Sequence, residues 1–125
     1  MKIWTPSRDW SSKFLWTVNS SKPQYGGFDY RVSKTNTQAV EVVAECEAAV
    51  RWLPSIRAGV KSYCRRMREE DEAFQDIKIS LTKIYEHEVD TRERVMYCRG
   101  LVFLHHMKIK TFRESQLDFI EVETD

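Results

Sequence analysis

Three basic residues in the middle of the chain, Lys61, Arg65 and Arg68, are spaced to share one face of a helix. Residues at i, i+4 and i+7 lie above one another on a helix surface and form a stripe. A stripe of cations is a common way to contact phosphates, because charge attraction dominates non-specific affinity for nucleic acids. These three residues are therefore the candidate nucleic-acid-binding set.

An acidic run at 69–72 follows this stripe directly. On one continuous helix, three of its acids would each lie four residues after an arginine, as Glu69 does after Arg65. Such pairs add about 0.2–0.5 kcal/mol each to helix stability. The pattern predicts that the cations already have partners on a solvated, mixed-charge face. The formal net charge of +1 agrees, because nucleic-acid-binding domains are usually basic.

Histidine and cysteine are the other residue types here that could do chemistry, and they occur as His87, His105, His106, Cys46, Cys64 and Cys98. None stands in a CxxC, HExxH or GxSxG spacing, so the sequence predicts no metal, no cofactor and no assigned catalytic residue. A small enzyme that pairs Cys98 or Cys64 with a histidine is the third-ranked functional interpretation. Buried structural thiols are the simpler explanation of the cysteines.

The composition indicates one globular domain that stays in the cytoplasm. Hydrophobic residues make up 42% and charged residues 31% of the 125 positions. The N-terminal segment lacks the apolar region of a signal peptide, and no apolar run approaches the ~20 residues of a membrane span. Three widely spaced cysteines are not a disulfide framework, which favours a reducing compartment.

The first third of the chain predicts a β-hairpin over 13–33. Its two arms alternate aromatic or β-branched residues with polar ones, at Phe14, Trp16 and Val18 and again at Phe28, Tyr30 and Val32. A dense cluster of turn residues separates the arms. The segment 1–4 is expected to add a short edge strand.

Two stretches of helical periodicity follow, on either side of Pro54. Residues 36–53 have capping-box spacing at their start and an apolar stripe made by Ala39, Val43, Cys46, Val50 and Leu53. A second stripe comprises Ile56, Val60, Tyr63, Cys64 and Met67. Pro54 either kinks one helix or separates two, and both alternatives stay open.

The remainder of the chain predicts three strands, at 77–89, 95–112 and 117–122. The phase of the alternation slips at 84–85, which indicates a bulge. A helix starting at Asp90, with Glu93 as its capping partner, is the alternative for 91–106. The aromatic and β-branched content favours a strand. The predicted fold class is α+β: one antiparallel sheet, built from the hairpin and a three-strand meander, with two helices or one kinked helix on one face.

The run Leu101, Val102, Phe103 and Leu104 is apolar at every position. As a strand it would be buried on both faces, which requires further covering structure or another subunit. The N-terminal segment, with Trp4 and Trp10, is one candidate cover. These six residues are therefore the candidate protein interface.

The sequence thus favours a non-enzymatic protein-interaction or self-assembling module, with a second copy or another protein as partner. Small accessory or structural proteins encoded by viruses or phages are one class that fits. Nucleic-acid binding along the basic stripe is the alternative function, because a stripe of cations is a common way to contact phosphates.

Overall fold

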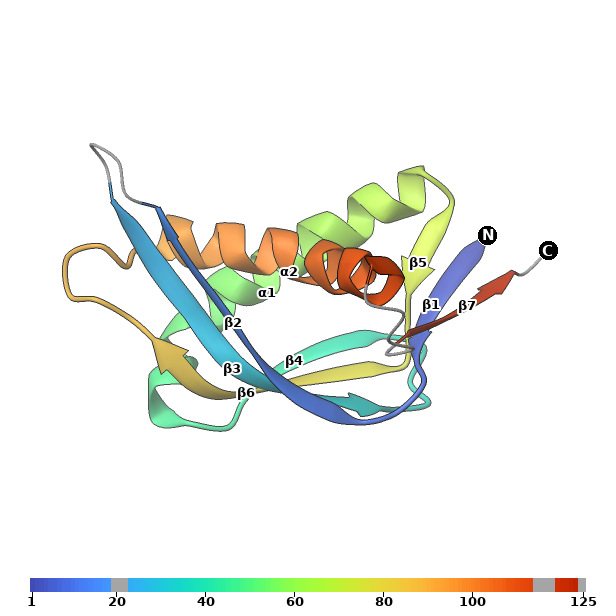
Figure 1. Cartoon of the computed structure of the whole chain (residues 1–125), viewed down its shortest axis with the longest axis horizontal. Coiled ribbons are helices and arrows are strands. Elements are labelled where there is room, and N and C mark those ends of the chain that lie inside the picture. Colours follow the sequence, from blue (N-terminus) through green and yellow to red (C-terminus); the bar gives the residue numbers. More distant parts are fainter. Residues whose placement is uncertain (19–22, 114–118, 124–125) are drawn as a thin grey trace.

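The structure is a computed structural model that describes residues 1–18, 23–113 and 119–123 (Figure 1). Its elements in chain order are β1 (Lys2–Pro6), β2 (Trp10–Val18), β3 (Gln24–Lys34), β4 (Val40–Ala44), α1 (Glu47–Glu69), β5 (Glu72–Phe74), β6 (Ile77–Tyr85), α2 (Glu93–Arg113) and β7 (Phe119–Glu123). The predicted α+β class is confirmed.

A four-stranded sheet with the order β2-β3-β6-β4 forms one layer, and both helices lie on the same side of it (Figure 1). The pairs β2–β3 and β3–β6 are antiparallel, whereas β4 runs parallel to β6. The sheet is therefore mixed rather than wholly antiparallel. A parallel pair needs a long crossover connection, and here α1 and β5 lie in that connection.

The predicted hairpin is confirmed as β2 and β3, with Phe14 opposite Phe28 in the register. The helix-facing side of these strands is apolar, and it forms the floor of the core with β6. The β3–β6 register shifts between Asp29 and Tyr30, so a bulge exists close to the predicted phase slip. Alternation alone was enough to predict this part because both strands bury one face only.

The predicted helix over 36–53 is wrong in its first half. Residues 40–44 form the edge strand β4, and α1 begins only at Glu47. Val50, a member of the predicted apolar stripe, is 63% exposed. The valines of this segment fit either period, and parallel pairing with β6 selects the strand. Pro54 lies inside α1, so the structure contains one continuous helix here rather than two.

The predicted strand over 95–112, and with it the three-strand meander, is also wrong. This segment is the helix α2, the alternative that the capping signal at 90–93 had indicated. Met96, Phe103 and Met107 are buried, and their spacing of seven and four residues is that of a helix face. The aromatic and β-branched content favours a strand, but burial of one helix face against α1 and the sheet outweighs this intrinsic preference.

The two helices touch through their backbones at Gly59 and Gly100. A Cβ atom at Gly59 would lie 2.1 Å from the carbonyl oxygen of Tyr97, and one at Gly100 would lie 2.3 Å from that of Ile56. These distances are shorter than any non-bonded contact between carbon and oxygen. Glycine is therefore required at both positions for the helices to cross this closely.

Arg99 anchors α2 to the hairpin from within the protein, where its side chain is 2% exposed. Its Nε donates to the carbonyl oxygen of Gly26 at 2.9 Å, and its Nη2 donates to that of Trp16 at 3.1 Å. Burial lowers the pKa of Arg99, because the charged form loses solvation. The two carbonyl dipoles replace part of that solvation.

A second, three-stranded sheet with the order β5-β1-β7 brings the chain ends together (Figure 1). β1 was expected as an edge strand but is the central one, parallel to β5 and antiparallel to β7. The predicted last strand is confirmed as β7, with Leu117 and Asp118 outside the described residues. Lys108 of α2 contacts both carboxylate oxygens of Glu72 at 3.1 Å, which ties this sheet to the helices.

Candidate functional site

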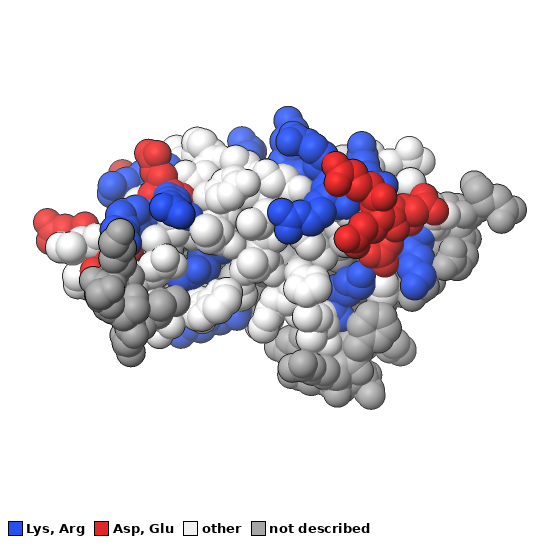
Figure 2. All heavy atoms as spheres, turned by 90° about the horizontal axis from the view of Figure 1, so that it is seen from above, with Lys and Arg blue, Asp and Glu red and all other residues white. Residues whose placement is uncertain are grey.

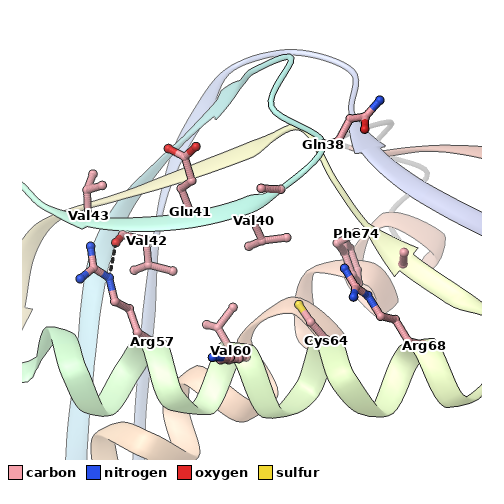
Figure 3. Close-up of a pocket in the computed structure, with 13 residues that line it drawn as sticks. Gln38, Val40, Glu41, Val42, Val43, Arg57, Val60, Cys64, Arg68 and Phe74 are labelled. Carbon is pink, nitrogen blue, oxygen red and sulfur yellow. Dashed lines mark hydrogen bonds between the residues drawn. The ribbon is translucent and has the colours of Figure 1, made fainter.

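A groove of ≈ 640 Å³ runs between the edge strand β4 and the helix α1 (Figure 3). Val60 and Cys64 point from α1 toward β4, and Val40 and Val42 point from β4 toward α1. Phe74 of β5 lies at the other end of the groove from Arg57. The walls are thus mainly apolar, and edge strands of both sheets contribute to them.

The outer side of β4 carries backbone groups that no described strand pairs. The carbonyl oxygen of Ala39 accepts a hydrogen bond from the amide of Ile77 at 3.1 Å. The amide of Glu45 donates to the carbonyl oxygen of Leu81 at 2.9 Å. Backbone groups of successive strand residues point to opposite sides, so odd-numbered residues of this segment face β6. The residues whose N–H and C=O groups face outward are Val40, Val42 and Ala44.

Arg57 covers one of these outward groups. Its Nε donates to the carbonyl oxygen of Val42 at 2.8 Å, from α1 across the groove (Figure 3). An exposed strand edge pairs readily with another chain, and proteins often protect such edges with charged side chains. Arg57 therefore protects the middle of the β4 edge.

Three cations from α1 line the groove: Arg57, Lys61 and Arg68. Their spacing of i, i+4 and i+11 places them along one side of the helix. Glu41 is the acidic residue among the lining residues, and it points away from α1 (Figure 3). The helix side of the groove is therefore positively charged.

Two of these cations were predicted from the sequence, and the third was not. Lys61 and Arg68 belong to the predicted basic stripe and lie in the groove, whereas Arg65 is exposed and is not among the lining residues. Extending the helical spacing back from Lys61 by four residues would have found Arg57.

The predicted pairing of this stripe with the acidic run does not occur among the described residues. α1 ends at Glu69 with Glu70 as its C-cap, so Asp71 and Glu72 lie outside the helix, and no ion pair in the described part of the chain joins the arginines at 65, 66 and 68 to the acids at 69, 70 and 72. Asp71 has a φ of 61° and approaches the N-terminal amino group at 3.6 Å, and Glu72 pairs with Lys108 instead. The positive charge at the end of α1 is therefore available to a partner.

The surface seen from the helix side shows this separation of charge (Figure 2). On the right of this view, a group of Lys and Arg side chains lies directly beside a group of Asp and Glu side chains, and further charged side chains of both signs lie together on the left. All of Lys61, Arg65, Arg66, Arg68, Glu69, Glu70 and Asp71 are exposed. The two groups correspond to the last turns of α1 and to the turn that follows it.

Cys64 lies in the groove wall, and burial raises the pKa of its thiol to about 11, although nearby Arg68 acts in the opposite direction. The thiolate, which is the nucleophilic form, is therefore scarce at neutral pH. This weakens the interpretation of Cys64 as a catalytic nucleophile.

In a Cys46→Ser, Cys98→Ser variant, we expect alkylation of native Cys64 to accelerate about tenfold per pH unit up to roughly pH 10. The reason is that the deprotonated fraction grows in this way below a pKa of about 11. Rates of iodoacetamide reaction across pH measure it, with the same variant in denaturant as the control. A native rate that already levels off near pH 8.5, as in denaturant, would contradict the raised pKa.

The six residues of the predicted interface are divided between core and surface. Trp4, Phe103 and Leu104 are 2%, 1% and 0% exposed and belong to the core. The others, Leu101, Val102 and Trp10, are half-buried against it. Residues 101–104 belong to the helix α2 and not to a strand with two apolar faces. The reason for predicting an interface here is therefore absent, and the interface itself stays a prediction.

A smaller hollow of ≈ 500 Å³ lies at the opposite edge of the sheet, between β2 and α2. Its lining includes Val102, both adjacent histidines and Trp16, which is 49% exposed. His105 is within hydrogen-bonding distance of the Tyr63 hydroxyl, at 3.3 Å, and the ring of His106 lies 5.3 Å from that of Phe14. Among the described residues, no three His, Cys, Asp or Glu side chains are placed to share a metal ion.

Comparison with known proteins yields a likeness of fold alone. No protein family matches the chain, and no match is found among curated proteins. A crystal structure of a protein from Thermus thermophilus superposes with a TM-score of 0.63 and 14% identity, over 80% of this chain. That superposition covers 16% of the other chain, so the present protein corresponds to a small part of a much longer one. Within the described residues, neither helix is long and apolar enough to cross a membrane.

Proposed function

We propose that this protein is a non-enzymatic binding module that docks another protein in the groove between β4 and α1. The observation that carries the proposal is the position of an unpaired strand edge directly beside an apolar groove. Backbone groups on such an edge supply affinity for an extended segment, and the adjacent apolar walls supply contacts for its side chains. A cytoplasmic setting is part of the proposal, supported by the three free cysteines.

Nucleic-acid binding along Lys61, Arg65 and Arg68 is the second proposal. The observation that favours it is that these cations are exposed, while most of the acids that follow them leave the helix. The groove favours a protein partner, because its walls are valine-rich and offer few exposed aromatic rings on which bases could stack. The acidic group beside the cations would also repel a polyanion (Figure 2).

A blocking experiment tests the groove without assuming the chemistry of its occupant. In a background with all three cysteines changed to serine, Lys61→Cys is labelled with a bulky maleimide, and Arg65→Cys is labelled as the matched control. Peptides selected from a random display library on the unlabelled protein should lose at least tenfold in affinity when the label is at position 61. They should keep their affinity when it is at position 65, because this residue lies on α1 outside the groove.

Equal losses from both labels, or none from either, would contradict docking in the groove. A library that produces no binder, together with salt-sensitive binding of a single-stranded oligonucleotide that Lys61→Gln and Arg68→Gln abolish, would support the second proposal instead. Light scattering of the wild-type protein reports whether the chain self-associates, which docking of a second copy in the groove requires.

A further inference from the structure

We infer that the groove takes an extended acidic segment of a partner protein, which adds to the large sheet as a strand beside β4. This inference rests on the proposed function and specifies the partner's chemistry. Three features carry it: the outward backbone groups of β4, the cations of α1, and the hydrogen bond from Arg57 that crosses the groove.

The backbone of β4 is suited to strand addition. Three of its residues present both an N–H and a C=O group to the free side, as the pairing with β6 shows. An added strand would satisfy these groups in the plane of the sheet, and alternate side chains of that strand would face α1. There they would lie over the floor made by Val60 and Cys64 (Figure 3).

The positive charge extends along the whole length of such a strand. Arg57 and Arg68 are eleven residues apart on α1, which corresponds to about 16 Å at the rise of a helix. A strand of the five residues of β4 also spans about 16 Å. Carboxylates on the helix-facing side of the segment would therefore meet Arg57, Lys61 and Arg68 in turn. A basic segment would meet like charge at each of these positions.

Arg57 has a particular part in this arrangement. In the free protein, Nε of Arg57 donates a hydrogen bond to the carbonyl oxygen of Val42, which is one of the acceptors that an added strand needs. A carboxylate is a stronger partner for a guanidinium than a neutral carbonyl is. An acidic segment can therefore draw Arg57 away from Val42 and open the edge, whereas a neutral segment of the same length must compete with it.

A second copy of the chain fits less well. Pairing two copies edge to edge through β4 would place two sets of Arg57, Lys61 and Arg68 side by side. Like charges at such close range oppose association. The one acidic residue of β4 in the second copy does not offset this, because Glu41 points away from α1 (Figure 3).

The test uses the whole chain of 125 residues and a capped peptide of about seven residues that alternates Glu and Val, enough to span the edge. We expect saturable binding below about 1 mM, with shifts of the amide signals of Val40, Val42 and Ala44 in NMR spectra. The same peptide N-methylated at alternate residues should bind at least tenfold more weakly, because it cannot pair with the strand edge. A Lys–Val peptide should not bind.

Two matched variants distinguish the effect of a charge that lines the groove from the effect of a charge elsewhere on α1. Lys61→Gln should weaken the Glu–Val peptide about threefold, whereas Arg65→Gln should leave its affinity unchanged. Unchanged affinity of the N-methylated peptide would overturn strand addition, and binding of the Lys–Val peptide would overturn the acidic partner. If these peptides fail while display-selected peptides still depend on position 61, the inference falls and the proposed function stands. If both fail, both fall.

Discussion

Gly100→Ala is expected to destabilise the protein by about 3 kcal/mol or more, at the upper end of the cost of overpacking a core. The added methyl group would lie 2.3 Å from the carbonyl oxygen of Ile56, and its neighbours are backbone atoms that cannot rotate away. The helices would have to move apart and lose contacts along their length. Urea unfolding, compared at constant m-value, measures the change.

The control for this substitution is Ala58→Gly, at an exposed position of α1 next to the crossing. It should cost only about 1 kcal/mol, the ordinary difference in helix propensity between the two residues. By propensity alone, Gly100→Ala would stabilise α2 by about the same amount. An unfolding midpoint for Gly100→Ala above that of the wild type would therefore show that the helices do not cross at this glycine.

Phe103→Ala should cost about 3–5 kcal/mol, the range for removing a buried aromatic ring. Phe103 is 1% exposed, and its ring centroid lies 5.4, 5.2 and 4.7 Å from those of Phe14, Phe28 and Tyr30. Its removal leaves a cavity where α2 meets the sheet, and three rings lose their common neighbour. Chemical denaturation again measures the loss.

Val102→Ala is the matched control for Phe103→Ala. Val102 is adjacent in sequence but half-buried, at the hollow beside β2. It should cost about 1 kcal/mol, because few methyl groups leave the core. Similar costs at the two positions would mean that both side chains are equally buried in solution. That result would again support the protein interface that was predicted from the apolar run at 101–104.

The hairpin shows where the sequence was sufficient. Its aromatic residues alternate because β2 and β3 each bury one face, so local periodicity carries the whole signal. The same holds for the buried stripe of α1 after Pro54, where Ile56, Val60 and Met67 all proved to be buried. In these segments, the local preference and the tertiary structure agree.

The segments 40–44 and 95–112 show where the sequence was insufficient. Apolar residues at helical spacing and a capping signal favoured a helix over 40–44, and aromatic and β-branched content favoured a strand over 95–112. Both preferences were wrong, because apolar segments of this kind fit a strand or a buried helix. β4 forms because β6 offers it a parallel partner, and α2 forms because Gly59 and Gly100 let it pack closely on α1. Both partners lie far away in sequence, and no local pattern records them.

The candidate site divides in the same way. The charge of the groove follows from the residues alone, since the helical spacing of Lys61 and Arg68 places them on one side of α1 whatever surrounds it. The unpaired strand edge opposite these cations exists because of long-range pairing between β4 and β6. Most of the acids that were expected to pair with the cations lie outside the helix, because α1 ends at Glu69. A helix end and a strand partner depend on distant contacts, whereas the face on which a side chain lies is a matter of local geometry.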